Sequence, residues 1–306
     1  MTRDVYKPEL VSLTEPKTEA LMGSSVMSVL GMHLARNARK YIYFKVNALL
    51  SLVQSLAQLL VFLYMGRLLS THDGWSRGTY ESFLIAGMTL LQWLDKGLIG
   101  PYASVSGAYW SARLEPLLLA PRSLWLFVTA DTVWYYLLTN INIAAIFITG
   151  RLFGARLTMP QDIPRFGLIV VLATLSVFGM GLMSASAFSL INAKGRDEPI
   201  SWAVHLLQGL VSGLYFPFSL LPTPLQYAGL LLPHTYAIDG VRRLMVPRYG
   251  QSGPTLTIHR LMPCDPQLLN IFCLAICLVV YLSLGVYLFQ KGMRKSQEAG
   301  SLSRWT

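Results

Sequence analysis

The chain has 306 residues, of which 53% are hydrophobic and only 13% are charged, and its mean hydropathy is +0.47. Soluble domains carry about a quarter charged residues, so this composition indicates an all-α membrane protein with several spans rather than a soluble domain. The formal charge of +10 does not indicate nucleic acid, because no basic run with interleaved aromatic residues lies outside the apolar segments. Cationic loops that set membrane orientation explain the charge better.

Common catalytic signatures are missing from the sequence. No Gly is followed by Lys, so there is no Walker-type phosphate loop, and there is no Gly-x-Ser-x-Gly, His-x-x-x-His or Cys-x-x-Cys pattern. The three cysteines, Cys264, Cys273 and Cys277, form no metal-binding pattern. We expect no catalytic, cofactor or metal site in this chain, so the energy for any transport has to come from elsewhere.

The N-terminal part divides into a tail and a helix. Residues 1–23 are polar and lack the apolar core of a cleaved signal, which predicts a polar tail. In residues 24–41 apolar side chains recur at three and four positions, while basic residues gather toward the end. This pattern predicts an amphipathic helix in the membrane interface, with an ordinary juxtamembrane anchor as the alternative.

Residues 42–290 are predicted to cross the membrane six times, and residues 291–306 form a C-terminal tail. The first span, at 42–65, is long enough at about 1.5 Å per residue and carries one polar stripe that is expected to face other helices or the pathway. The second span, at 80–105, carries Gln92, Asp95 and Lys96 near its middle.

Each of the two charges costs about 2.5 to 3.5 kcal/mol at a helix centre on insertion scales. We therefore expect Gln92, Asp95 and Lys96 to face a wet pathway or a subunit interface, with partners on other helices. The alternative is that one charge is ion-paired within the bundle and the other extends toward the interface.

Three further spans follow at 124–148, 166–190 and 271–289, and another begins at Trp202. The span at 124–148 contains Asp131, which either faces the pathway or pairs with a nearby arginine.

Residues 212–245 are apolar but interrupted by prolines. Proline removes an amide donor and biases the preceding residue away from α-helix, so this stretch predicts short helices joined by breaks. Broken chain at membrane depth has to be buried in protein or line a wet cavity. We expect a re-entrant segment on the outer side that forms part of a path or gate, with candidate residues Phe216, Pro217, Pro222, Pro233 and Tyr236.

The run SGLYFPFSLLPTPLQYAGLLLPHTYAIDGVRRL within this stretch resembles the signature of the ABC transporter type-2 permease family. That signature has a small residue, an aromatic-Pro pair, a Leu-Pro pair, Leu-Leu-Pro-x-x-Tyr and a closing Arg. The matching residues here are Gly213, Phe216-Pro217, Leu221-Pro222, Leu231-Leu232-Pro233, Tyr236 and Arg242. By the order of apolar segments the resemblance extends over roughly residues 32–290.

A second motif lies in residues 106–123, where the family places a short cytoplasmic coupling helix that often contains Gly-Thr-Leu-Glu, an apolar stretch and Thr-Pro. This chain keeps Leu114-Glu115 and Pro121 but has Ala112-Arg113 in place of Gly-Thr. The resemblance implies that this region docks on an ATPase, and a plain interfacial loop helix is the alternative. The implied coupling residues are Arg113, Leu114, Glu115, Pro116, Pro121 and Arg122.

The resemblance implies a membrane subunit of an ATP-driven exporter for a lipid-like, glycan or drug-like molecule. Its partners would be two copies of an ATP-binding subunit, which hold ATP and Mg, a second permease copy or paralogue, and membrane lipids, but no nucleic acid. Lys and Arg are more frequent in the segments assigned to the inside, which favours six spans with both termini cytoplasmic. We expect a multi-pass protein of a bacterial plasma membrane. The alternative is an intramembrane enzyme or ion-driven carrier that uses Asp95, Lys96 and Asp131; a structural scaffold is disfavoured by the charges in mid-span.

Overall fold

The computed structural model describes residues 26–43, 45–69, 79–119, 123–156, 158–160, 162–190, 199–247, 249, 255–262 and 264–298. Within these ranges every regular element is helical, which confirms the all-α prediction. The predicted tail at 1–23, the end of the predicted C-terminal tail, Pro121 and Arg122 lie outside them. The helices are α2 (Val26–Tyr43), α3 (Lys45–Leu69), α4 (Thr79–Trp110), α5 (Leu114–Leu119), α6 (Ser123–Leu152), α7 (Ile163–Leu190), α8 (Pro199–Val211), η1 (Phe218–Leu220), α9 (Thr223–Leu230), α10 (Pro233–Met245), α11 (Thr257–Leu261) and α12 (Pro266–Glu298).

Three helices of the described chain are long and apolar enough to cross a membrane: Leu124–Leu152, Ile163–Phe188 and Pro266–Glu298. They coincide with the spans predicted at 124–148, 166–190 and 271–289. Helices α3 and α4 are 25 and 32 residues long, so each matches a membrane in length at about 1.5 Å per residue. The chain is therefore an integral membrane protein by composition and by helix length.

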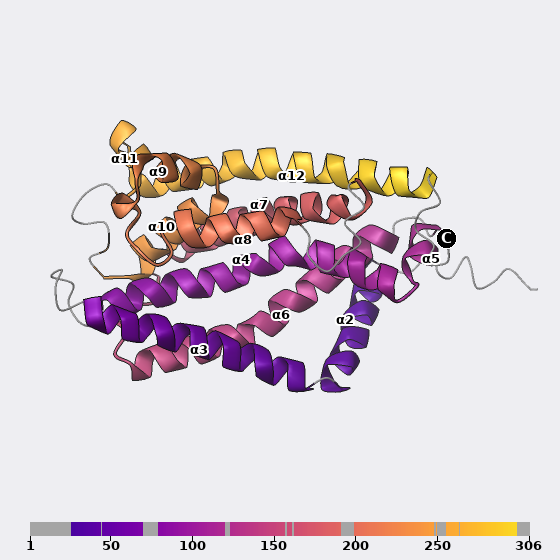
Figure 1. Cartoon of the computed structure of the whole chain (residues 1–306), viewed down its shortest axis with the longest axis horizontal. Coiled ribbons are helices and arrows are strands. Elements are labelled where there is room, and N and C mark those ends of the chain that lie inside the picture. Colours follow the sequence, from indigo (N-terminus) through magenta and orange to yellow (C-terminus); the bar gives the residue numbers. More distant parts are fainter. Residues whose placement is uncertain are drawn as a thin grey trace, which may run out of the picture.

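Helix α7 lies between α4 and α12 at the centre of the bundle (Figure 1). The three helices approach one another through glycines: a Cβ at Gly181 would overlap the carbonyl oxygen of Gly97, and one at Gly285 would overlap that of Gly179. Small residues allow membrane helices to come this close.

The prolines of residues 212–245 interrupt the helix as predicted. The helical chain ends at Val211 and continues in the short pieces η1, α9 and α10. Pro217 and Pro222 directly precede η1 and α9, and Pro233 is the first residue of α10. Proline is tolerated at these positions because the first amides of a helix have no partner within the helix. We call residues 212–245 the broken segment.

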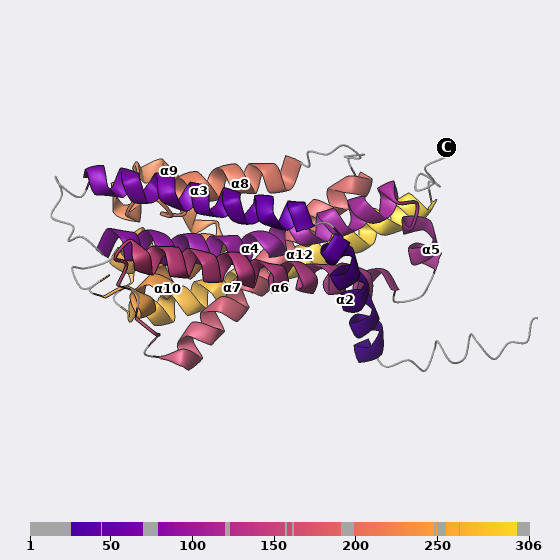
Figure 2. The same cartoon turned by 90° about the horizontal axis from the view of Figure 1, so that it is seen from below.

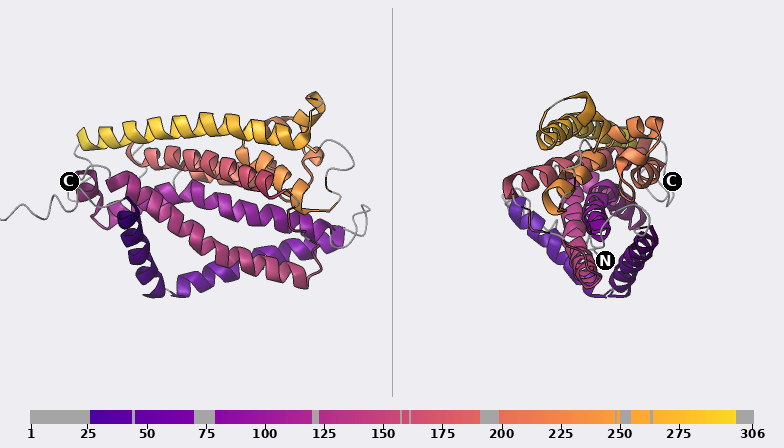
Figure 3. Two further views of the ribbon diagram at one scale, coloured as in Figure 1. Left: turned by 180° about the vertical axis from the view of Figure 1, so that it is seen from behind. Right: turned by 90° about the vertical axis from the view of Figure 1, so that its left-hand side faces the viewer.

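The two ends of the bundle differ. Helices α9, α10 and α11 lie at one end, whereas α5 and the C-terminal end of α12 lie at the other (Figure 1). Helix α2 leaves the second end at a steep inclination to the long helices (Figures 2 and 3). The buried apolar side chains form two clusters, and those of the cluster at the α5 end come from α4, α5, α6, α7 and α12.

Candidate functional site

Arg242 lies in α10, near the end of the broken segment, and is only 2% exposed. Its side chain binds backbone carbonyls near the start of that segment. Its Nε donates to the carbonyl of Phe83 at 3.0 Å, and Nη1 and Nη2 donate to the carbonyls of Gly213 and Leu214, each at 2.6 Å. The guanidinium carbon lies 3.4 Å from the ring centre of Phe83. Carbonyls that follow the end of a helix have no intrahelical partner, so Arg242 supplies the donors that the break at the end of α8 requires.

Two glycines make room for this arrangement. Gly213 has a φ of +71°, a conformation that glycine adopts without steric cost. A Cβ at Gly87 in α4 would overlap Nη2 of Arg242. The sequence signature therefore has a physical basis at both of its ends, the small residue and the closing arginine.

Tyr236 and Thr235 fasten the next break. The hydroxyl of Tyr236 donates to the carbonyl of Leu230 at 2.8 Å, and that of Thr235 donates to the carbonyl of Gly229 at 2.6 Å. Both acceptors lie at the end of α9. Tyr236 and Pro233 are buried, whereas Phe216, Pro217 and Pro222 are wholly or partly exposed. Of the predicted gate residues, Tyr236 has a contact that stabilises the fold, and Phe216 is the large side chain that is exposed.

A buried polar cluster connects α10 with α11 and α12. Oδ2 of Asp239 accepts from Nε of Arg243 at 2.8 Å and from Nδ2 of Asn270 at 2.7 Å, and Oδ1 accepts from the hydroxyls of Tyr249, at 3.0 Å, and Thr255. His259 contacts Asn270 through Nε2 at 3.1 Å. We call this set the Asp239 cluster. Tyr249, Thr255 and His259 thus give the described part of the connection between α10 and α12 a structural role, because this cluster holds the N-terminal end of α12 against α10.

Asp95 in α4 meets two side chains of α8. Nε2 of Gln208 donates to Oδ1 of Asp95 at 2.8 Å and lies 2.7 Å from Nδ1 of His205, which is itself 3.6 Å from Oδ1 of Asp95. We call Asp95, His205 and Gln208 the Asp95 cluster. The expectation that Asp95 has its partners on another helix is confirmed. Gln92 and Lys96 are half-buried and make no hydrogen bond or ion pair within the described part of the chain.

Asp131 has a different environment from Asp95. Its Oδ1 accepts from Nη2 of Arg36 at 3.1 Å and from Nδ2 of Asn37 at 2.7 Å, and the guanidinium of Arg36 also lies 5.3 Å from the ring centre of Phe127. The structure thus has the arginine pairing that was one of the two alternatives for Asp131. This contact fastens α2 to α6.

Helix α5 is held to the bundle at its first residue. Leu114 is 1% exposed and packs in an apolar cluster with Tyr109, Phe188 and Phe289, whereas Arg113 and Pro116 are exposed. Glu115 is the second residue of α5.

The turn before α5 has a left-handed residue. Ala112 has a φ of +54°, its amide donates to the carbonyl of Tyr109 at 3.0 Å, and the amide of Arg113 donates to that of Ala108 at 2.8 Å. These bonds form a Schellman motif, whose left-handed position usually holds glycine.

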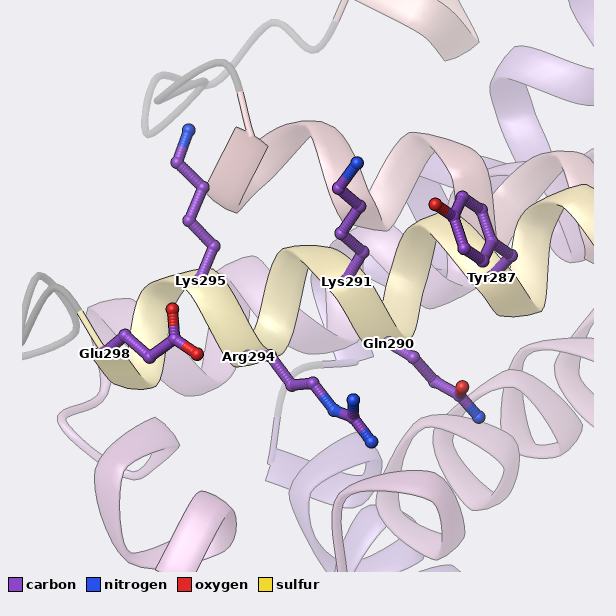
Figure 4. Close-up of a pocket in the computed structure, with 6 residues that line it drawn as sticks. All are labelled: Tyr287, Gln290, Lys291, Arg294, Lys295 and Glu298. Carbon is purple, nitrogen blue, oxygen red and sulfur yellow. The ribbon is translucent and has the colours of Figure 1, made fainter.

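Two cavities lie outside these clusters. One of about 500 Å³ follows the last turns of α12, where Lys291 and Lys295 project to one side and Arg294 to the other (Figure 4). Another of about 260 Å³ is apolar and lies between α4, α6, α7 and α10, with Trp93, Phe147 and Phe166 in its wall. Within the described ranges no three His, Cys, Asp or Glu side chains gather as a metal site.

A model of the ABC-2 family transporter proteins matches residues 79–287. The chain belongs to this family. The match starts at the first residue of α4 and ends within α12, so it includes α5, the Asp95 cluster and the broken segment. A comparison with curated proteins found no match.

Family membership identifies the chain as a membrane transport permease and an integral membrane protein. Permeases of this family are the membrane components of transporters and work with a separate ATP-binding subunit; they are generally not catalytic themselves. This agrees with the resemblance found in the broken segment.

Proposed function

We propose that this permease is one of two membrane subunits of an exporter that is driven by two copies of an ATP-binding subunit. The observation that carries the proposal is the placement of α5 and the broken segment at opposite ends of the same helices (Figure 1). A permease needs one surface that receives the motion of its ATPase and another that opens and closes the path. Here α5 provides the first, and η1, α9 and α10 provide the second.

In this proposal the chain crosses the bacterial plasma membrane six times, with both termini in the cytoplasm. The spans are α3, α4, α6, α7, α8 with the broken segment, and α12. Helices α9 and α10 form a re-entrant part on the outer side, and α2 lies in the cytoplasmic interface. Lys291, Arg294 and Lys295 at the α5 end of α12 (Figure 4) support this orientation, because positively charged residues favour the cytoplasmic side.

The contacts of the long helices suggest how motion reaches the outer end. Leu114 lies in one apolar cluster with Tyr109, Phe188 and Phe289, and α5 contacts α4 and α6. A displacement of α5 therefore acts on α4 and α6 and, through this cluster, on α7 and α12. At its other end α12 holds α10 through Asn270, which donates to Asp239, and Gln267, which donates to the carbonyl of Gly240 at 3.0 Å. Closure of the ATP-binding subunits would push α5 and shift α10 with the breaks that it holds.

The exporter's cofactors belong to its partner: ATP and Mg would bind in the ATP-binding subunit. The second membrane subunit would be another copy of this chain or a paralogue. A lipid-like, glycan or drug-like molecule is the proposed cargo, which would pass along α4 beside Gln92, Asp95 and Lys96.

The test is co-purification of the solubilised chain with its native ATP-binding subunit, followed by an ATPase assay. We expect hydrolysis of the complex to fall about fivefold or more in Glu115→Arg, since couplings between sites are typically 1–3 kcal/mol. Glu298→Arg is the matched control, because it reverses one charge at the same end of the molecule and should leave hydrolysis unchanged.

A chain that purifies without an ATP-binding subunit and moves its cargo only down an ion gradient would contradict the exporter proposal. Co-purification with unchanged hydrolysis in Glu115→Arg would contradict the coupling role of α5 alone.

A further inference from the structure

The Asp95 cluster has hydrogen-bonding capacity that the protein does not use. Gln208 is 2% exposed, and its Nε2 serves both Asp95 and His205, but its Oε1 has no partner in the described part of the chain. A buried polar atom without a partner costs about 1–3 kcal/mol. Such an atom in a native protein needs an explanation, and an unfilled binding site is one.

The hydrogen bonds indicate the tautomer of His205. An amide nitrogen only donates, so Nδ1 of His205 accepts from Nε2 of Gln208. In this tautomer Nδ1 of His205 has no proton to donate to Oδ1 of Asp95, which lies 3.6 Å away. Lys96 follows Asp95 directly in the helix and makes no ion pair with it, because adjacent helical residues point away from one another. Asp95 thus has a neutral donor in Gln208 but no Lys or Arg side chain within ion-pair distance among the described residues.

A second unsatisfied group continues the cluster toward α10. His234 is 0% exposed, both of its ring nitrogens lack a partner among the described residues, and it lies within electrostatic range of His205. In the Asp239 cluster both carboxylate oxygens accept hydrogen bonds. In the region of Gln208 and His234, by contrast, buried amide and imidazole atoms have no hydrogen-bond partner among the described residues. The contrast between the two clusters indicates that the Asp239 cluster stabilises the fold and that the Asp95 cluster binds a ligand.

The surroundings indicate the chemistry of that occupant. The side chains of Asp95 and His205 are 19% and 33% exposed, so a ligand reaches them. The exposed side chains of α8, the helix that carries His205 and Gln208, are apolar: Trp202, Leu206, Leu207 and Leu210. A carboxylate at membrane depth is stable only when it is protonated or paired with a cation. The complementary ligand has a cationic donor group and an apolar body.

We propose that Asp95 and Gln208 bind the protonated amino group of the exported molecule, so that the permease selects amine-bearing amphiphiles over neutral or anionic ones. This inference rests on the proposed exporter function and specifies its cargo class. Asp95 supplies the charge, Gln208 supplies an acceptor once it turns its Oε1 toward the ligand, and the apolar side chains of α8 contact the tail.

The experiment uses the complex of this chain with its ATP-binding subunit in liposomes and measures stimulation of ATP hydrolysis. The probes are decylamine, decyl glucoside and decyl sulfate, which share one chain length and differ in head group. We expect decylamine to stimulate at a concentration about tenfold or more below the other two, because truncating one partner of a buried charge pair costs at least about 2 kcal/mol. Asp95→Asn should remove this preference and Asp95→Glu should retain it.

The control is Asp162→Asn, which removes a carboxylate by the same substitution at the start of α7 and should keep the preference. Equal potency of the three probes in the unmodified complex, or a decylamine preference that survives Asp95→Asn, would overturn the inference, as would stronger stimulation by decyl glucoside. The probe comparison in the unmodified complex decides the matter even where Asp95→Asn does not fold. A complex that hydrolyses ATP and responds to Glu115→Arg without preferring decylamine contradicts only this inference, whereas a chain without an ATPase partner contradicts the exporter function itself.

Discussion

The guanidinium of Arg242 donates to the carbonyl of Gly213 at 2.6 Å, across 28 intervening residues that include η1 and α9. The contact closes the broken segment into a loop whose two ends are bonded to each other. Water is scarce at membrane depth, so carbonyls that a break exposes need a donor from the protein. One arginine supplies three donors here, and the planar fork of its side chain matches carbonyls that no single ammonium group would reach together.

We predict that Arg242→Lys destabilises the protein by about 3 kcal/mol or more, because at least two of the carbonyls of Phe83, Gly213 and Leu214 lose their donor at about 1–3 kcal/mol each. Urea or thermal unfolding in detergent measures the loss. Arg260→Lys is the matched control, since Arg260 is exposed on α11 and should tolerate the change. If both variants unfold alike, Arg242 does not hold the break.

The breaks themselves were predictable, because proline acts through its own covalent structure. Pro217, Pro222 and Pro233 lie at the helix starts that their missing amide allows. The partner of Arg242 was not predictable: it consists of backbone carbonyls, which every residue has, so no side-chain pattern marks it. The charge of Asp131 predicted a cationic partner but not which residue it would be. Arg36 lies 95 positions away in sequence, and no periodicity connects the two residues.

The contacts within the Asp239 cluster could not be predicted from the sequence either. The groups that bond Asp239 come from α10, α12 and the connection between them, and all are ordinary polar residues. Nothing in their spacing distinguishes them from solvated loop residues. For the Asp95 cluster, the sequence predicted that the charge in mid-span has partners on another helix, because an unpaired charge there is costly. Only the fold identifies these partners as Gln208 and His205.

We predict that Ala112→Gly stabilises the protein by about 0.5 to 1 kcal/mol. A left-handed conformation costs a non-glycine residue about 1–2 kcal/mol, of which the greater flexibility of glycine in the unfolded chain cancels a part. The residue has a φ of +54° and lies where the family pattern often has glycine. A rise in melting temperature would confirm the strain.

Ser111→Gly is the control for this substitution, because Ser111 precedes Ala112 in the same turn and has no positive φ. It should not stabilise the protein. A melting temperature that falls equally in both variants would contradict strain at Ala112.

We predict that the α11 end of the protein loosens at acidic pH through His259. Burial lowers the pKa of His259 below its ordinary value, opposed by the nearby carboxylate of Asp239, while Arg243 lowers it further. The folded protein therefore binds this proton less readily than the unfolded chain does. The resulting stability is present above the ordinary pKa of about 6.5 and is lost as the pH falls toward the lowered value.

Hydrogen exchange of the peptides around α11, compared at pH 7.5 and pH 5, measures this effect. We expect faster exchange at pH 5 and a smaller pH difference in His259→Asn. His33→Asn is the control: burial also lowers the pKa of His33, but that residue lies on α2, away from α11. A pH response of these peptides that is the same in His259→Asn as in the unmodified protein would exclude His259 as its source.

We predict that Gly285→Ala destabilises the protein by about 1–3 kcal/mol, the usual cost of overpacking a core. The added Cβ would overlap the carbonyl of Gly179, and backbone cannot yield without moving α7 away from α12. Gly167→Ala in α7 is the matched control, because its Cβ would meet no heavy atom within 4 Å.

The same separation of α7 and α12 would pull Asn270 from Asp239 and loosen α10, so ATP hydrolysis by the complex should lose its response to cargo in Gly285→Ala but not in Gly167→Ala. Equal melting temperatures of the two variants would show that these helices do not approach as closely as the glycines allow.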